Sequence, residues 1–229
     1  MKILKTFLLF MGSLIITGTS RAQPINWKNL QKDNKQLATI TAGLDYGLVF
    51  GAGYSYQLTT GRPILLHAEI SVPSGENIFD DFKTKTGGRI NLYQQNHFYA
   101  SASLHGIYRR SQNAFVRLQN FGAELSGDIG YYKPRWFAAI AVGFDKAILT
   151  QLKHSAVYKQ NYPAVKDGWY GTSTGGNFNF GLQTGYSLKH SDITLQIGKL
   201  VSQDFSTKPL LPFYFQLGYT FKIGKAGRQ

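Results

Sequence analysis

The chain has 229 residues and a formal net charge of +13, from 25 Lys and Arg against 12 Asp and Glu. Charged residues make up 16% of it and aromatic residues 14%, with 25 Gly and no Cys, whereas an average soluble domain has about 25% charged residues. This composition argues against a disordered chain, which has few aromatic and many charged residues. It also argues against a coiled coil, which is rich in charge and poor in Gly, and against a disulfide scaffold, which needs cysteines.

The first 22 residues have the parts of a secretory signal peptide. Lys2 and Lys5 precede the apolar stretch 7–16, and small or polar residues follow up to Ala22. Because the stretch is about half the length of a membrane-spanning helix, we predict a signal peptide over 1–22 that is cleaved after Ala22.

Cleavage would remove Lys2, Lys5 and Arg21 and lower the net charge from +13 to +10. An exported basic protein is not expected to meet nucleic acid. Its natural counter-surfaces are anionic lipid head groups or polysaccharide, although the charge could equally serve solubility. Residues 23–36 are predicted to form a periplasmic N-terminal segment.

The rest of the chain alternates apolar and polar side chains. Residues 177–188 and 213–223 do so most clearly, and a period of two is typical of β-strands. Similar runs occur at 37–46, 48–58, 64–73, 87–95, 98–108, 115–131, 136–145 and 193–201. We therefore predict an all-β chain of about ten strands, with short helices possible in 25–36 and 147–160. A barrel of eight strands remains an alternative, because the run 87–95 is short and the first hairpin has almost no loop.

Short and long connections alternate after the first hairpin. The short ones lie at 59–63, 94–97, 132–135 and 189–192, and the long ones at 74–86, 109–114, 146–175 and 202–211. This order is typical of an up-and-down antiparallel barrel with both termini on the periplasmic rim and long loops outside. The predicted barrel spans 37–223, followed by a tail at 224–229.

The two faces of the strands indicate a transmembrane β-barrel. The polar face carries small uncharged residues such as Thr39, Ser101 and Asn179, as a narrow lumen requires. The apolar face carries aromatics near strand ends, such as Trp136 and Phe213, where an interfacial girdle would lie. The alternative is a soluble, secreted, lipocalin-like binding barrel that turns the aromatic face inward.

These features together resemble the small, porin-like outer-membrane β-barrel proteins of Gram-negative bacteria. The similarity covers the signal peptide, the strands, the order of turns and loops, and the aromatic-rich last strand Phe213 to Ile223. It implies an outer-membrane location and recognition of that strand by the barrel-assembly machinery. The chain departs from the commonest form because six residues follow the strand, where many members end on Phe. The resemblance is to an architecture and carries no function with it.

Alternation turns several ionisable side chains into the predicted lumen. These are His67, Glu69, Arg89, His105, Glu124 and Asp128. We expect ion pairs linking the four charged members, because buried acidic groups need basic partners. The alternative is a membrane-embedded hydrolase acting on lipid or peptide at the outer leaflet. The chain lacks the His-x-Ser arrangement of lipid A deacylases and the acidic pairs of omptin proteases. Without Cys or metal-ligand His spacing, no metal or cofactor is predicted.

The longest predicted loop combines aromatic residues with lysines. These are Lys153, Tyr158, Lys159, Tyr162, Lys166, Trp169 and Tyr170. Such a set suits carbohydrate stacking and anionic lipopolysaccharide, although the aromatics could simply pack the loop over the barrel mouth. The sequence therefore predicts a non-enzymatic outer-membrane barrel with a structural, surface-interaction or narrow-pore role, in contact with outer-membrane lipid and lipopolysaccharide.

Overall fold

The computed structural model describes residues 23–30, 35–45, 47–58, 60–74, 80–171, 176–205, 209 and 211–224. The predicted signal peptide, and the predicted tail beyond Gly224, lie outside these residues. The strands are β1 (Gln36–Leu44), β2 (Leu48–Leu58), β3 (Ile64–Pro73), β4 (Phe82–Gln95), β5 (Phe98–Gln112), β6 (Val116–Tyr132), β7 (Trp136–His154), β8 (Gly168–Gly171), β9 (Gly176–Ser187), β10 (Ser191–Ser202) and β11 (Phe213–Ile223). The short helices are η1 (Trp27–Asn29) and α2 (Ala156–Asn161).

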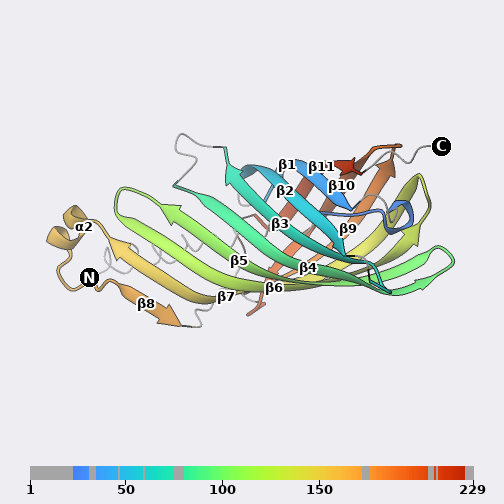
Figure 1. The fold of residues 1–229 in the computed structure, drawn as a ribbon. Helices are drawn as coiled ribbons and strands as arrows, with labels where there is room; N and C mark the ends of the chain where they lie inside the picture. The colour runs from blue at the N-terminus through green and yellow to red at the C-terminus, as the bar shows by residue number, and fades with distance from the viewer. Residues whose placement is uncertain are drawn as a thin grey trace.

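Ten of these strands form a closed barrel (Figure 1). Each pairs antiparallel with its neighbours in the chain, and β11 pairs with β1 from Ile223 opposite Gln36 to Phe215 opposite Leu44. The remaining strand, β8, only extends the ladder at the far end of β7. The prediction of an all-β, up-and-down barrel of ten strands is therefore confirmed.

Several strands are longer than the hydrophobic pattern predicts. β4 begins at Phe82 and β7 continues to His154, so the predicted loops 74–86 and 146–175 are shorter in the structure. The extra residues interrupt the apolar alternation with charged and polar side chains, such as Lys83 and Lys85 in β4 and Gln151 and Lys153 in β7. They still form strands because each finds a ladder partner on the neighbouring strand, as His154 does opposite Val116.

The exterior of the barrel is apolar and its interior is polar. Leu104 and Leu125 point outward and are each 62% exposed, whereas the inward-facing His105 and Glu124 are each 1% exposed. A soluble barrel has the reverse arrangement. Among the described residues, no helix is long and apolar enough to cross a membrane.

The two ends of the barrel differ (Figure 1). Tight turns join β2 to β3, β4 to β5, β6 to β7 and β9 to β10 at one end, which we name the turn end. At the other end, β6 and β7 project with α2 and β8. We name this projection, residues 115–121 and 148–171, the arm.

Candidate functional site

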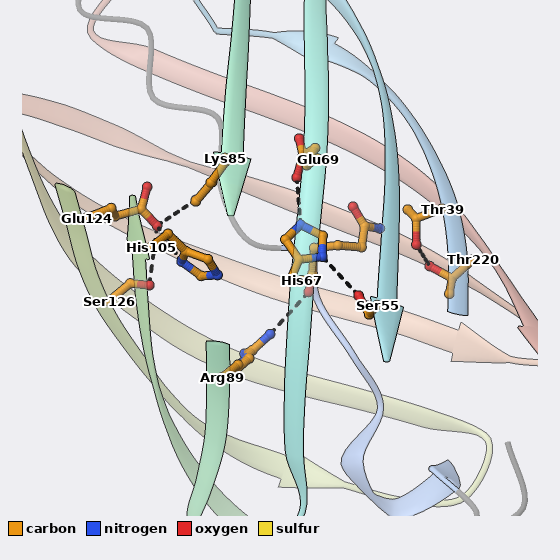
Figure 2. Close-up of polar contacts among 11 residues, drawn as sticks. Thr39, Ser55, His67, Glu69, Lys85, Arg89, His105, Glu124, Ser126 and Thr220 are labelled. Carbon is orange, nitrogen blue, oxygen red and sulfur yellow. Dashed lines mark hydrogen bonds and ion pairs between the residues drawn. The ribbon is translucent and has the colours of Figure 1, made fainter. Parts of the chain in front are cut away.

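The lumen holds all six ionisable residues predicted to face it. His67 and Glu69 come from β3, Arg89 from β4, His105 from β5, and Glu124 and Asp128 from β6, and all six are buried. They lie on the inner wall because each occupies the polar position of its strand's alternation. Figure 2 draws five of them pointing into the barrel.

Two ion pairs cross the lumen side of β5. Lys85 Nζ lies 2.7 Å from Glu124 Oε1, and the Arg89 guanidinium contacts the Asp128 carboxylate. Both pairs join β4 to β6, and all four side chains are almost fully buried. Since an unpaired charge in such a place is strongly destabilising, the pairing is what allows charges here at all. The expected partner of Glu124 in the network, Arg89, is therefore replaced by Lys85.

His67 lies between a hydroxyl and a carboxylate. Its Nδ1 is 2.9 Å from Ser55 Oγ and its Nε2 is 3.1 Å from Glu69 Oε2 (Figure 2). Glu69 is thus paired with a histidine on its own strand. The two contacts hold the imidazole in one orientation against the inner wall.

A serine, a histidine and a carboxylate in contact invite comparison with a hydrolytic triad. Two features of the Ser55, His67 and Glu69 group favour a structural role. All three residues are buried in the lumen. The ladder bonds of β2 and β3 also engage the backbone N–H groups that an oxyanion hole would need.

His105 occupies the centre of the lumen. Its ring meets that of His67 edge-on, with centroids 5.9 Å apart, and its Nδ1 is 3.9 Å from Glu124 Oε1. Gly87 on the neighbouring strand makes room for it, because a Cβ there would collide with the Leu104 carbonyl and the His105 ring. The described residues contain no group of three or more His, Cys, Asp or Glu able to hold a metal ion.

The lumen contains further charges that sequence reasoning missed. Lys83 and Lys85 are buried on the inner wall, although the sequence assigned them to a mixed-charge outer loop. Asp145 lies 3.3 Å from Arg109 across β6, and Asp192 lies 2.7 Å from Lys222 between β10 and β11. One signal was present: Lys83 and Lys85 continue the odd-numbered inward positions of Arg89.

The N-terminal residues enter the barrel at the turn end. Residues 23–30, which we name the plug, are mostly buried, so this part of the predicted periplasmic segment lies inside the barrel. Gln23 Nε2 donates to Thr194 Oγ1 at 2.5 Å, while Arg89 donates to the Gln23 carbonyl at 3.1 Å. Gly218 leaves the space for Gln23, because a Cβ there would overlap the Gln23 amide.

Asn26 and Trp27 complete the plug. Asn26 Nδ2 donates to the Lys133 carbonyl and to Ser187 Oγ, both at 2.9 Å. Trp27 packs in an apolar cluster with Ile25, Leu37, Leu65, Tyr99, Tyr132, Phe137 and Ala139. No local sequence signal predicted that residues 23–30 enter the barrel, because their hydrogen-bonded partners are more than 60 positions away in the chain.

The plug and the ion pairs form one connected structure. The Arg89 guanidinium lies 5.5 Å from the Trp27 ring centroid and also binds Asp128. Tyr132 stacks on Phe137 within the apolar cluster, and its hydroxyl donates to Asp128 at 2.9 Å. The apolar cluster around Trp27 at the turn end is therefore joined directly to the ion pair of Arg89 and Asp128.

The predicted contact residues of the longest loop lie on the arm. Lys153 belongs to β7 and not to a loop, Tyr158 and Lys159 belong to α2, and Trp169 and Tyr170 belong to β8. Tyr162 and Lys166 lie in the connection between α2 and β8, and six of the seven residues are exposed, the exception being the half-buried Tyr158.

Aromatic contacts and one acidic residue organise the arm. The Tyr158 ring stacks on His154 and lies 4.9 Å from Tyr162. Asp167 accepts hydrogen bonds from the His154 backbone at 2.8 Å and from Lys159 Nζ at 2.5 Å. The His154 backbone bond and the Lys159 ammonium hold the pKa of the Asp167 carboxyl well below its usual range.

Comparison with known proteins gives distant structural similarity only. No family model matches the chain, and no curated protein matches its sequence. A "KdgM porin" and a "KdgM porin in complex with disordered oligogalacturonate" each share 10% identity with it, covering 82% of this chain and 99% of the other. Their TM-scores are 0.39 and 0.38. At such values neither neighbour informs function, which is argued below from this chain's own side chains.

Proposed function

We propose that the protein is a non-enzymatic β-barrel of the bacterial outer membrane whose lumen is closed at rest. The apolar exterior supports the location. Large apolar side chains exposed on the barrel wall include Ile40, Phe50, Ile70, Leu104, Leu125, Ile129, Ile140, Leu182, Ile197 and Leu217. A continuous apolar surface of this kind is unfavourable in water and matches the hydrocarbon core of a bilayer.

The position of the plug inside the barrel is the main support for a closed lumen. It fills the turn end with Trp27 and its apolar neighbours, while ion pairs and histidines occupy the middle of the lumen. A ten-stranded barrel is narrow enough for side chains to fill most of its interior. We therefore infer that ions pass only if the plug leaves.

The proposed orientation puts the turn end and both termini in the periplasm and the arm outside the cell. Short turns face the periplasm in bacterial outer-membrane barrels, and longer connections face outward. Cleavage after Ala22 would then make Gln23 the first residue of the mature chain, inside the lumen.

The arm is the proposed contact surface. Lys159, Lys166, Trp169 and Tyr170 are all exposed on the arm, and the Tyr170 hydroxyl donates to the Lys166 carbonyl at 3.0 Å. Lysines and aromatic rings together suit the phosphates and sugars of lipopolysaccharide. We further propose that the barrel-assembly machinery recognises β11, whose outward face carries Phe213, Phe215 and Phe221.

Two measurements test this proposal. Envelope protein extracted in mild detergent is compared by gel mobility with and without boiling, and a closed membrane barrel should migrate as a compact species until heated. Recovery in the soluble fraction without a heat-dependent shift would favour the lipocalin-like alternative. In planar bilayers, the intact protein should give no stepwise conductance.

A plug-replacement variant sharpens the second measurement. Replacing residues 23–30 by a Gly-Ser sequence of equal length should produce salt-dependent conductance steps, because the apolar cluster then loses Trp27 and Ile25. The same replacement of residues 156–163 in the arm is the control and should stay silent. Equal conductance of the intact chain and the plug variant would contradict closure by the plug.

A further inference from the structure

The turn end carries a group of exposed cations. Arg62 lies in the turn between β2 and β3, Lys133 and Arg135 lie in the turn between β6 and β7, and Lys189 lies in the turn between β9 and β10. We name these four residues the basic rim. All four are exposed to solvent.

Among the described residues of the turn end, the basic rim has no exposed acidic counterpart. The nearest acidic residue along the chain from Lys189, Asp192, is buried and paired with Lys222. At the arm end, by contrast, Asp80, Asp81, Asp167 and Asp204 are at least partly exposed. The exposed cations of the arm end therefore have acidic residues near them, whereas those of the basic rim have none among the described residues.

Hydrogen bonds fix the backbone of two rim residues, Lys133 and Arg135. The Lys133 N–H donates to the Trp136 carbonyl at 2.8 Å, which closes the turn, and Asn26 of the plug donates to the Lys133 carbonyl at 2.9 Å. The Ser187 N–H donates to the Arg135 carbonyl at 2.7 Å. This last bond brings the turn that carries Lys189 beside the turn that carries Lys133 and Arg135.

Aromatic side chains of the outer wall lie next to Lys133 of the basic rim. Lys133 Nζ is 5.8 Å from the Tyr131 ring centroid and 5.7 Å from that of Trp136. Tyr131 in turn contacts Phe98, with ring centroids 5.4 Å apart, and Trp136 pairs in register with Tyr186. Rings of this kind lie at the level of lipid head groups, so the cations just beyond them lie at the level of lipid phosphates.

We propose that the basic rim binds the phosphate groups of anionic phospholipids, such as phosphatidylglycerol, in the leaflet that faces the turn end. This inference rests on the proposed membrane function. The ammonium and guanidinium groups pair with the phosphodiester, and the rings of Tyr131 and Trp136 contact the glycerol and upper acyl region. A lipid fits better than a soluble polyanion because the cations adjoin the lipid-facing rings.

Trp136 provides the reporter for the test. It is 40% exposed on the outer wall next to Lys133, whereas Trp27 is buried in the lumen and out of reach of lipid. The parent protein for the test is therefore the full chain with Trp169→Phe on the arm. It is refolded into phosphatidylcholine vesicles containing either brominated phosphatidylglycerol or brominated phosphatidylcholine, and quenching of Trp136 fluorescence is measured.

We expect brominated phosphatidylglycerol to quench Trp136 with an apparent association constant about five times that of brominated phosphatidylcholine, since one basic residue near an anionic surface is worth about that factor. The double variant K133Q/R135Q should bring the ratio to about one. The matched control K153Q/K166Q, at the arm end, should keep the parent ratio. Conservative K133R/R135K should also keep it, which separates loss of charge from loss of fold.

The outcomes separate the inference from the function on which it rests. Equal quenching by both lipids in the parent, or an unchanged ratio in K133Q/R135Q, would overturn the lipid site while leaving the membrane barrel intact. Binding of soluble peptidoglycan fragments without any lipid preference would also overturn it. Absence of quenching by either lipid, with no heat-dependent gel shift, would instead contradict the membrane function.

Discussion

The lumen is filled mainly by apolar side chains at the turn end of the barrel and by charged side chains towards the arm end. At the turn end, a segment from outside the ladder enters the lumen and brings Ile25 and Trp27 against inward-facing aromatics such as Phe137. Towards the arm end, the lumen is lined by ion pairs such as Arg109 with Asp145. The difference teaches that the apolar cluster inside this barrel gathers where another chain segment packs against it. Towards the arm end, paired charges line the lumen beside single apolar residues such as Ile107 and Leu200.

The largest effect is expected from removing Trp27 from the apolar cluster. Trp27→Ala should lower the free energy of unfolding by about 3–5 kcal/mol, the usual cost of deleting a buried large aromatic side chain. The comparison is with Trp169→Ala on the arm, where the ring is 51% exposed and we expect less than about 1 kcal/mol. Urea unfolding from lipid vesicles measures both, and equal losses would mean that the two ends do not differ as described.

A smaller but still large loss is expected from breaking one ion pair in the middle of the lumen. Glu124→Leu should cost about 3 kcal/mol, because Lys85 is left charged in a buried position. The double variant K85M/E124L should recover most of that loss in the same unfolding experiment. If the double variant is no more stable than Glu124→Leu, the pair is not an independent unit.

The link between the apolar cluster and the ion pair of Arg89 and Asp128 should be weaker. Tyr132→Phe keeps the stack on Phe137 and removes only the hydrogen bond to Asp128. We expect a loss of about 1 kcal/mol, typical of one hydrogen bond. Tyr131→Phe, on the outer wall, is the control and should leave the unfolding midpoint unchanged.

The smallest effect concerns the arm and depends on pH. Because folding lowers the pKa of Asp167, its contacts stabilise the arm above the unfolded pKa of about 3.9 and are lost as the pH falls through the folded value. Acidification below pH 4 should therefore lower the hydrogen-exchange protection factors of the amides around His154, taken relative to the intrinsic rate at each pH, while the barrel stays protected. Asp167→Asn should lower these protection factors already at neutral pH, and protection that does not depend on pH would contradict the assignment.

The strand pattern could be predicted because the two faces of the barrel differ in chemistry. Alternation placed residues such as Phe180 outward and Asn179 inward, and it gave the right number of strands. It failed at the start of β4, where Lys83 and Lys85 alternate with threonines. Such a polar run shows no apolar alternation, so the sequence analysis assigned it to a loop. The extension forms because the neighbouring strand supplies its backbone partners, which is not a local property.

The lumenal site could be predicted only in part. Period two placed Glu69 and Glu124 inside the barrel, yet it did not give the partner of Glu124, because Lys85 lies two strands away on β4 and the register of the strands sets their distance. The plug could not be predicted either, since Asn26 meets Lys133 and Ser187 only after the ring of strands has formed.

The position of the plug has a consequence for the closure of the barrel. Its partners include Arg89 on β4, Thr194 on β10 and Ser187 on β9, which come together only when β1 has joined β11. The complete set of plug hydrogen bonds therefore requires the closed ring, and it ties strands on both sides of the β1–β11 contact to one N-terminal segment.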